Sequence, residues 1–452
     1  MNHGRLYRTI WRWHFYAGLF VLPFILILSL TGSVYLFKPQ TDRWEERAYR
    51  HLSLSHAVSP DQQVSAALAA YPGAGFQKYR LPENPGDAAL IELAQPAGKT
   101  PAGKTLAGKT LDVFVSPQGQ VVGSLSPDSR ISNIVSKIHG TLLLGKWGDW
   151  LIELAASWTI MLILSGLYLW WPRPFRLAGT IWPRPYLKGR PLLKDIHRVI
   201  GFWVAGFVLV LLISGLPWAG AWGSAFKWVR AEMGWVKGTS EWKIGTETTV
   251  ADEHAGHDHM AMQMSMPSMS MPSSLPLSLF VQKAQNEHLV YPVVVLPPYA
   301  PQSFGPANDK NWLVKSETQN RPLARQISYD PVTGNEVARS GFADKHALDR
   351  LVGTFIAWHE GQLFGWINQL IGLMTAIALI TVSVLGTLMW LKRRPVGTPI
   401  NQLSAPPPVP GVKLGWVIAF AVGMGLLLPL FGLSLLVIFA VDLGLGRFRR
   451  RV

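Results

Sequence analysis

The sequence contains no cysteine and has few charged residues. Of its 452 residues, 15% are charged and 49% are hydrophobic, whereas an average soluble domain carries about 25% charged residues. Without cysteine the chain cannot form disulfides, thiolate-ligated zinc or iron–sulfur sites, or haem attached through a Cys-x-x-Cys-His motif. Any redox centre must therefore be held by other side chains, and the low charge indicates a membrane protein.

Long apolar runs predict an α-helical polytopic membrane protein. A helix that crosses a bilayer needs roughly 20 apolar residues, and four runs reach this length, at about 15–37, 150–171, 200–221 and 367–391. A fifth apolar region covers residues 414–441. Pro429 and Gly432 favour a break of this region into a hairpin, although a single span also fits its length.

Basic residues give the predicted orientation. Arginines precede the first span, basic residues fill the connection between the second and third spans, and four arginines lie near the C-terminus. Because basic loops remain in the cytoplasm, we expect a cytoplasmic N-terminus and two large external loops, 38–138 and 222–357. These basic segments explain much of the net charge of +15, so we expect the lipid bilayer, and no nucleic acid, as the partner.

The expected organisation follows from these spans and loops. In chain order, the segments are the N-terminal end with the first span (1–37), the first external module (38–138), the second span (139–171), a basic cytoplasmic loop (172–196), the third span (197–221), the second external module (222–357), the fourth span (358–391), a cytoplasmic linker (392–413), a C-terminal membrane hairpin or single span (414–445) and a basic tail (446–452).

The two external loops share one predicted plan, a helix followed by a small antiparallel sheet. The first loop has a helical pattern at 60–70, and the second has one at 275–288. A five-residue repeat at 96–110 lacks the spacing of a phosphate-binding loop and predicts a flexible insertion. The predicted strands are 88–93, 111–115 and 121–122 in the first loop, and 312–315 and 326–329 in the second.

Two interleaved repeats are built around histidines. His139 and His359 are each followed by a glycine and then a tryptophan, at the same two distances in both cases. His14 and His197 are each followed by two glycines, again at equal distances. The chain therefore has two halves, each with two apolar segments that begin at a histidine. The repeated positions are Gly166 and Trp170 after His139, Gly386 and Trp390 after His359, Gly18 and Gly32 after His14, and Gly201 and Gly215 after His197.

The direction of each span pairs these histidines by depth. His14 and His197 begin outward spans and belong to the cytoplasmic end, whereas His139 and His359 begin inward spans and belong to the outer end. Two histidines from neighbouring helices of a bundle can ligate haem iron, for which neutral imidazole is suitable. We therefore predict a four-helix haem-binding core, although single histidines at a membrane interface are common without any such role.

Neighbouring residues refine this haem hypothesis. A glycine shortly after each histidine, such as Gly145 after His139, can let a flat macrocycle approach the backbone. Arg12 and Arg198 can bind the haem propionates, but anchoring by the positive-inside rule explains them equally well. A straight helix from His139 to Trp170 would measure about 46 Å, against a hydrocarbon core of about 30 Å. We therefore expect the outer histidines at or above the outer surface, or on a bent helix.

A second metal hypothesis comes from the insertion at residues 251–272. Thioether and imidazole groups suit Cu(I), and short histidine-rich tracts often bind metal. The alternative is a disordered, methionine-biased loop without function. The candidate ligands are His254, His257, His259, Met260, Met262, Met264, Met266, Met269 and Met271.

Four segments together resemble the PepSY-associated transmembrane proteins. They are Arg12–Gly18 with the following Leu30–Gly32, Asp195–Arg198 with Gly201, Ile138–Gly140 with Gly145, and the final Leu428–Ser434. The resemblance covers nearly the whole chain and implies that the external loops are PepSY-like α+β modules. It also implies a bacterial inner-membrane protein in which two b-type haems have His14, His139, His197 and His359 as axial ligands.

The resemblance further implies a reductase of ferric siderophores, which passes electrons from a quinol or cytoplasmic donor to iron in the periplasm. The tract at 251–272 departs from the family pattern and leaves a cupric reductase or copper-handling protein open as the alternative. A regulatory PepSY anchor without enzymatic activity is a third hypothesis. The motifs Gly-x-Ser-x-Gly and His-Glu-x-x-His are absent from the sequence, so a hydrolase of either type is not expected.

Overall fold

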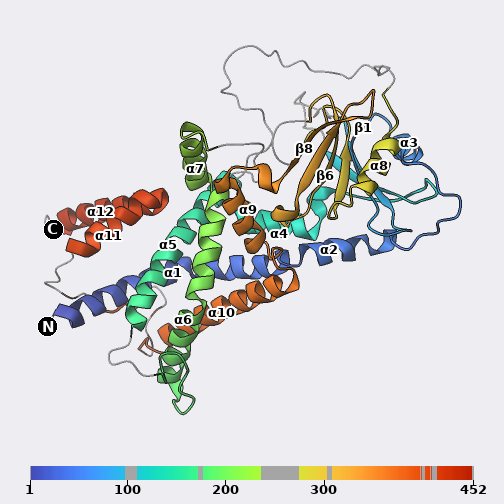
Figure 1. The fold of residues 1–452 in the computed structure, drawn as a ribbon. Coiled ribbons are helices and arrows are strands. Elements are labelled where there is room, and N and C mark those ends of the chain that lie inside the picture. Colours follow the sequence, from blue (N-terminus) through green and yellow to red (C-terminus); the bar gives the residue numbers. More distant parts are fainter. Residues whose placement is uncertain are drawn as a thin grey trace.

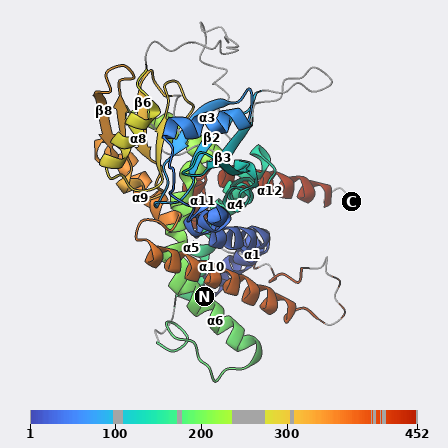
Figure 2. The ribbon, with the colours of Figure 1, turned by 90° about the vertical axis from the view of Figure 1, so that its right-hand side faces the viewer.

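The structure is a computed structural model with a helical part and a sheet. The residues that it describes are 2–96, 109–171, 177–235, 274–302, 308–395, 397, 399, 403–407, 409 and 415–449. The sheet lies at one end of the long helices, and α2 (Lys38–Glu45) continues from α1 toward it (Figures 1 and 2). The Met/His tract at 251–272 and most of the five-residue repeat lie outside the described residues.

Four helices of the described part are long and apolar enough to cross a membrane. They confirm the four predicted spans. Because α1 and α6 each contact both α5 and α10, the four helices form a closed ring. The helices are α1 (Asn2–Tyr35), α5 (Lys146–Trp170), α6 (Gly189–Gly215) and α10 (Trp366–Leu391).

The outer histidines lie on separate helices, which corrects the continuous spans 139–171 and 358–391 and agrees with the alternative of a bent helix. His139 lies on α4 (Ile131–Thr141), and His359 ends α9 (Ala347–His359), so both precede the spans α5 and α10. Gly145 and Gly365 begin those spans with φ values of 57° and 59°. This left-handed conformation favours glycine. The two glycines therefore take part in the bends, together with Leu142 and Leu143 before α5 and Gly361 before α10, which also have positive φ. The approach of a macrocycle to such glycines stays a prediction.

The strands of both external loops form one antiparallel sheet, in the order β4-β3-β2-β1-β5-β6-β7-β8. The prediction of two separate small sheets is wrong in this respect, because β1 pairs with β5 through Tyr79 and Val295. The strands are β1 (Gly75–Arg80), β2 (Ala89–Ala94), β3 (Thr110–Val115), β4 (Val121–Leu125), β5 (Val293–Leu296), β6 (Trp312–Ser316), β7 (Arg325–Tyr329) and β8 (Glu336–Gly341).

The two faces of the sheet differ in chemistry. One face packs against α3 (Pro60–Ala70) and α8 (Leu277–Asn286) in the main hydrophobic core. The carboxylate of Asp61 in α3 accepts hydrogen bonds from the first backbone N–H groups of α8 and links the two halves. The other face carries a buried ion-pair network, in which Arg130 contacts Glu46 and Asp112 at 2.9 Å each.

The C-terminal apolar region consists of two helices, α11 (Gly415–Leu427) and α12 (Pro429–Arg449), which pack against each other. The break at Pro429 is the one predicted for a hairpin. Gly432 permits the close approach, because a methyl group on it would lie 2.6 Å from the carbonyl oxygen of Gly425. Both chain ends lie at the end of the helical part away from the sheet (Figure 1).

Candidate functional site

The outer histidines lie together between the long helices and the sheet. The ring centroids of His139 and His359 are 6.4 Å apart, and the ring planes are nearly perpendicular, at 80°. Burial lowers the pKa of His139 to about 4, and burial together with the nearby His139 lowers the pKa of His359 to about 4. Both imidazoles are therefore neutral at pH 7, which is the protonation state that binds a metal.

The inner histidines come from α1 and α6. His14 and His197 are close enough to interact electrostatically. His14 packs against α5, where a methyl group on Gly166 would lie 3.1 Å from its Cε1 atom, and His197 packs against α10 near Gly386. The structure thus brings together each of the two pairs that the sequence predicts.

All four histidine rings lie against a glycine of another helix. His139 lies against Gly32 of α1, with 3.2 Å between Cε1 and the position of a methyl group on the glycine. His359 lies against Gly215 of α6 in the same way, at 3.4 Å. We call each such glycine, with the residue before it, a histidine seat. The four seats are Ser165-Gly166 for His14, Thr31-Gly32 for His139, Leu385-Gly386 for His197 and Ser214-Gly215 for His359.

Hydrogen bonds at the seats determine the tautomer of each imidazole. The Nδ1 atom of His197 lies 3.0 Å from the carbonyl oxygen of Val382, and since a carbonyl only accepts, Nδ1 carries the proton. Thr31 lies 3.0 Å from Nδ1 of His139, and its hydroxyl proton is already donated to the carbonyl of Ile27 at 2.7 Å. His139 must therefore donate as well.

The two serine seats repeat this arrangement. Ser165 lies 2.9 Å from Nδ1 of His14 and donates its proton to the carbonyl of Leu162. Ser214 lies 2.9 Å from Nδ1 of His359 and donates to a carbonyl of its own helix. All four histidines therefore keep the proton on Nδ1 and leave the lone pair of Nε2 available. A metal-bound histidine has this second-sphere arrangement.

The spacing of the outer pair fits the axial ligands of one metal ion. Imidazole–metal bonds measure about 2.0–2.1 Å and the ring centre lies roughly 1.1 Å behind the nitrogen, so two imidazoles on opposite sides of one ion have centroids about 6.3 Å apart. His139 and His359 show 6.4 Å. In the part of the chain that the structure describes, no group of three or more histidine, aspartate or glutamate side chains could hold a bare ion. The pair fits haem, whose macrocycle supplies the remaining ligands.

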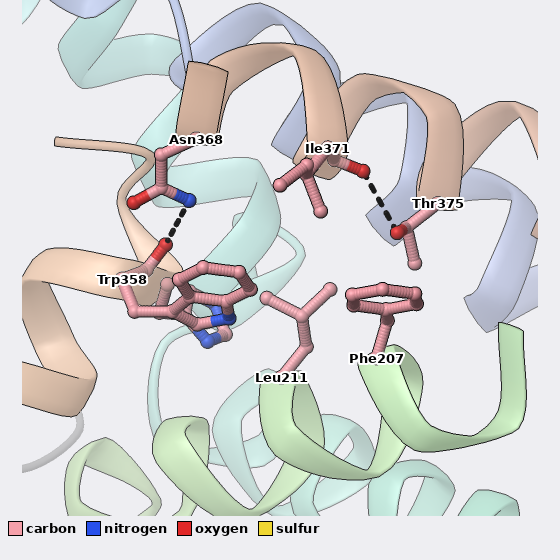
Figure 3. Close-up of a pocket in the computed structure, with 8 residues that line it drawn as sticks. Phe207, Leu211, Trp358, Asn368, Ile371 and Thr375 are labelled. Atoms are coloured by element: carbon pink, nitrogen blue, oxygen red, sulfur yellow. Dashed lines mark hydrogen bonds between the residues drawn. The ribbon is translucent and has the colours of Figure 1, made fainter. Parts of the chain in front are cut away.

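A small apolar cavity of about 10 Å³ lies beside His359. It lies between α6, α9 and α10, with Phe207 and Leu211 on one side and Ile371 on the other (Figure 3). The polar side chains of its lining are already paired, because Asn368 donates to the carbonyl of Trp358 and Thr375 donates to that of Ile371.

The two arginines next to the inner pair differ in their contacts. Arg198 donates from Nη2 to the carbonyl of Trp170 at 3.2 Å, and its buried Nε has no hydrogen-bond partner among the described residues. Arg12 instead donates to the carbonyl of Pro406 and lies over the ring of Tyr16. Arg198 is therefore the better candidate for binding a carboxylate such as a haem propionate.

The two pairs lie at opposite ends of the ring of helices. On α1 the inner histidine His14 is followed by Thr31, the seat of His139, and on α6 His197 is followed by Ser214 at the same interval. At about 1.5 Å per residue each interval is roughly 25 Å, close to the thickness of a hydrocarbon core. The hydroxyls of the seats recur directly before the repeated glycines, and this recurrence is the signal by which the sequence could have revealed them.

Comparison with known proteins gives one family. The model of the PepSY-associated TM region matches residues 11–393, a range that contains all four histidines and their seats. No curated protein matches the chain.

Proposed function

The chain belongs to the family of PepSY-associated transmembrane proteins, and on this premise we propose that it is a b-type haem reductase of a bacterial inner membrane. It would pass electrons across the membrane to a ferric chelate, such as a ferric siderophore, in the periplasm. The main support is the outer pair, His139 and His359, whose 6.4 Å separation fits two axial ligands of one iron.

The proposed roles follow from the geometry. His14 and His197 would hold the inner haem, with Arg198 and, less directly, Arg12 near its propionates. His139 and His359 would hold the outer haem. When bound, haem supplies reversible one-electron exchange. The hydrogen bonds at Nδ1 would leave Nε2 of each histidine available to the iron, and about 25 Å of helix would separate the two sites.

The proposed direction of transfer explains why the reaction would release iron. A quinol or a cytoplasmic reductase would donate electrons at the inner pair, and the chelate would accept them at the outer pair, beneath the sheet. Iron(III) gains one electron and becomes iron(II), which hard oxygen ligands hold more weakly. A PepSY-type anchor without a cofactor would need none of the four histidine seats.

A second candidate substrate is a cupric complex. The tract at 251–272, with His254, His257 and His259 followed by six methionines, has the ligand types that suit Cu(I). Reduction of Cu(II) beside this tract would supply the ion that its thioethers prefer. This observation concerns only the substrate, and the proposed haem core is the same in both cases.

An absorption spectrum of the purified, detergent-solubilised chain tests the proposal. We expect sharp bands of a b-type haem after reduction with dithionite, about two haems per chain, and oxidation of the reduced protein by a ferric siderophore or a cupric complex. Absence of haem from protein expressed with sufficient haem supply would refute the reductase. If the protein contains haem but neither the ferric siderophore nor the cupric complex oxidises it, the proposed substrates are wrong and the proposed haem core stands.

A further inference from the structure

We propose that Thr31, Ser165 and Ser214 are positioning residues that fix the rotation of the axial imidazoles. At the outer pair, Thr31 and Ser214 hold the two ring planes nearly perpendicular. This inference rests on the proposed haem function but adds a separate claim, namely that the hydroxyls of the seats set the spectroscopic and redox properties of each site.

Each hydroxyl is fixed by its own helix before it meets the histidine. Thr31 donates to the carbonyl of Ile27 at 2.7 Å, and Ser214 donates to that of Leu211 at 3.0 Å. The oxygen lone pairs are therefore directed by the helix backbone. They accept the Nδ1 protons of His139 and His359 at 3.0 and 2.9 Å.

The adjacent glycine restrains the same ring at a second point. The Cε1 atom of His139 lies 3.2 Å from the position of a methyl group on Gly32, so the ring rests against the backbone of α1. A ring held at both Nδ1 and Cε1 cannot rotate freely about its Cβ–Cγ bond. The perpendicular arrangement of the outer rings is then a property of two seats on two different helices, α1 and α6.

The seats also make the two sites unequal. Both outer histidines donate to hydroxyls, whereas the inner pair combines one hydroxyl, Ser165, with the main-chain carbonyl of Val382. A hydrogen bond from Nδ1–H makes the imidazole a more basic ligand, which favours ferric iron. Loss of a hydroxyl should therefore raise the reduction potential of the site that it serves and leave the other site unchanged.

Variants of the full-length protein test this inference. We would compare Thr31→Val and Ser214→Ala with Ser165→Ala, and use Thr31→Ser as the conservative replacement that keeps the hydroxyl. The matched control is Thr159→Val, because Thr159 is a buried hydroxyl of α5 that donates to the carbonyl of Ala155 and serves no histidine. The measurements are haem content, a redox titration followed by absorbance, and the EPR spectrum of the oxidised protein.

The EPR spectrum of low-spin ferric haem depends on the angle between the two axial imidazole planes. We expect Thr31→Val and Ser214→Ala to change the signal and raise the potential of one haem, and Ser165→Ala to raise the potential of the other. Thr31→Ser and Thr159→Val should match the unsubstituted protein. Loss of haem from Thr31→Val that Thr31→Ser restores would also support the inference.

Three results would overturn it. If Thr31→Val and Ser214→Ala keep both haems with unchanged EPR signals and potentials, the hydroxyls do not position the ligands, while the proposed function stands. The same conclusion follows if Thr31→Ser behaves like Thr31→Val. Absence of haem from the unsubstituted protein would overturn the proposed function, and this inference with it.

Discussion

Alanine substitution of the four seat glycines should produce a graded series. The distance from the new methyl group to Cε1 of the facing histidine is 3.1 Å at Gly166, 3.2 Å at Gly32, 3.4 Å at Gly215 and 3.7 Å at Gly386. All four glycines lie in long helices, where alanine is the better helix former by about 0.8–1 kcal/mol. The contact between the new methyl group and the facing histidine ring therefore decides whether each substitution stabilises or destabilises the protein.

The distances predict opposite outcomes at the two ends of the series. At Gly386 the methyl group would make an ordinary van der Waals contact, since carbon atoms attract best at about 3.5–4.0 Å. Gly386→Ala should keep its haem and be neutral or stabilising by up to about 1 kcal/mol. To reach that distance the ring must move by about 0.4 Å at Gly166 and about 0.3 Å at Gly32. Overpacking of this kind costs about 1–3 kcal/mol, so these two variants should bind haem less tightly.

The assay is haem per chain after purification, together with the midpoint of thermal unfolding. Gly206→Ala is the matched control, because Gly206 lies in α6 and a methyl group there meets no atom within 4 Å. We expect Gly206→Ala and Gly386→Ala to resemble the unsubstituted protein, Gly215→Ala to be intermediate, and the two tightest positions to lose most haem. If Gly386→Ala and Gly166→Ala lose equal amounts of haem, or if Gly166→Ala loses none, the predicted contacts between the seat glycines and the histidine rings are wrong.

Three other predictions concern the ligands, the sheet and the insertion. His359→Ala should halve the haem content, measured by absorbance, whereas His56→Ala, an exposed histidine, should leave it unchanged; equal loss in both would contradict the assignment. Arg130→Met breaks a buried ion-pair network and should cost about 3–5 kcal/mol of unfolding free energy. Arg339→Met removes a more exposed ion pair and should cost at most about 1 kcal/mol of unfolding free energy. If denaturant unfolding shows a larger loss for Arg339→Met than for Arg130→Met, this prediction is wrong. Deletion of 251–272 should abolish Cu(I) binding, measured by competition with a chelator, and preserve the haem spectrum; retained Cu(I) affinity would exclude the tract as the site.

The sequence predicted those features that local patterns encode. Apolar length predicted the four spans, and the equal spacings after His139 and His359 predicted their pairing. The histidine seats were visible only as recurring Ser-Gly or Thr-Gly dipeptides, because the partner of each dipeptide lies on another helix. The fourth seat, at Gly386, lacks a hydroxyl and uses a main-chain carbonyl, which no side-chain motif can reveal.

The parts that were not predicted depend on contacts between distant segments. The single sheet arises because β1 pairs with β5, which belongs to the other external loop and lies far along the chain. Strand β1 contains Lys78 and Arg80, which enter ion pairs on the charged face of the sheet, so its apolar alternation is weak. The sequence allowed a bent helix at the outer histidines but did not define α4 and α9 as separate helices. Their bends depend on backbone with positive φ, at Leu142, Leu143 and Gly145 before α5 and at Gly361 and Gly365 before α10, and two of these residues are leucines that no turn motif marks.

The interval on α1 between His14 and the seat of His139 also has an electrical consequence. Moving one elementary charge through the whole membrane potential changes the free energy by about 2.3 kcal/mol per 100 mV. An interval of roughly 25 Å covers most of a core of about 30 Å, so one electron crossing it would gain about 2 kcal/mol per 100 mV. In the proposed orientation the electron leaves the negative side of the membrane. An energised cell would therefore favour outward reduction, and an uncoupler that collapses the voltage should weaken it.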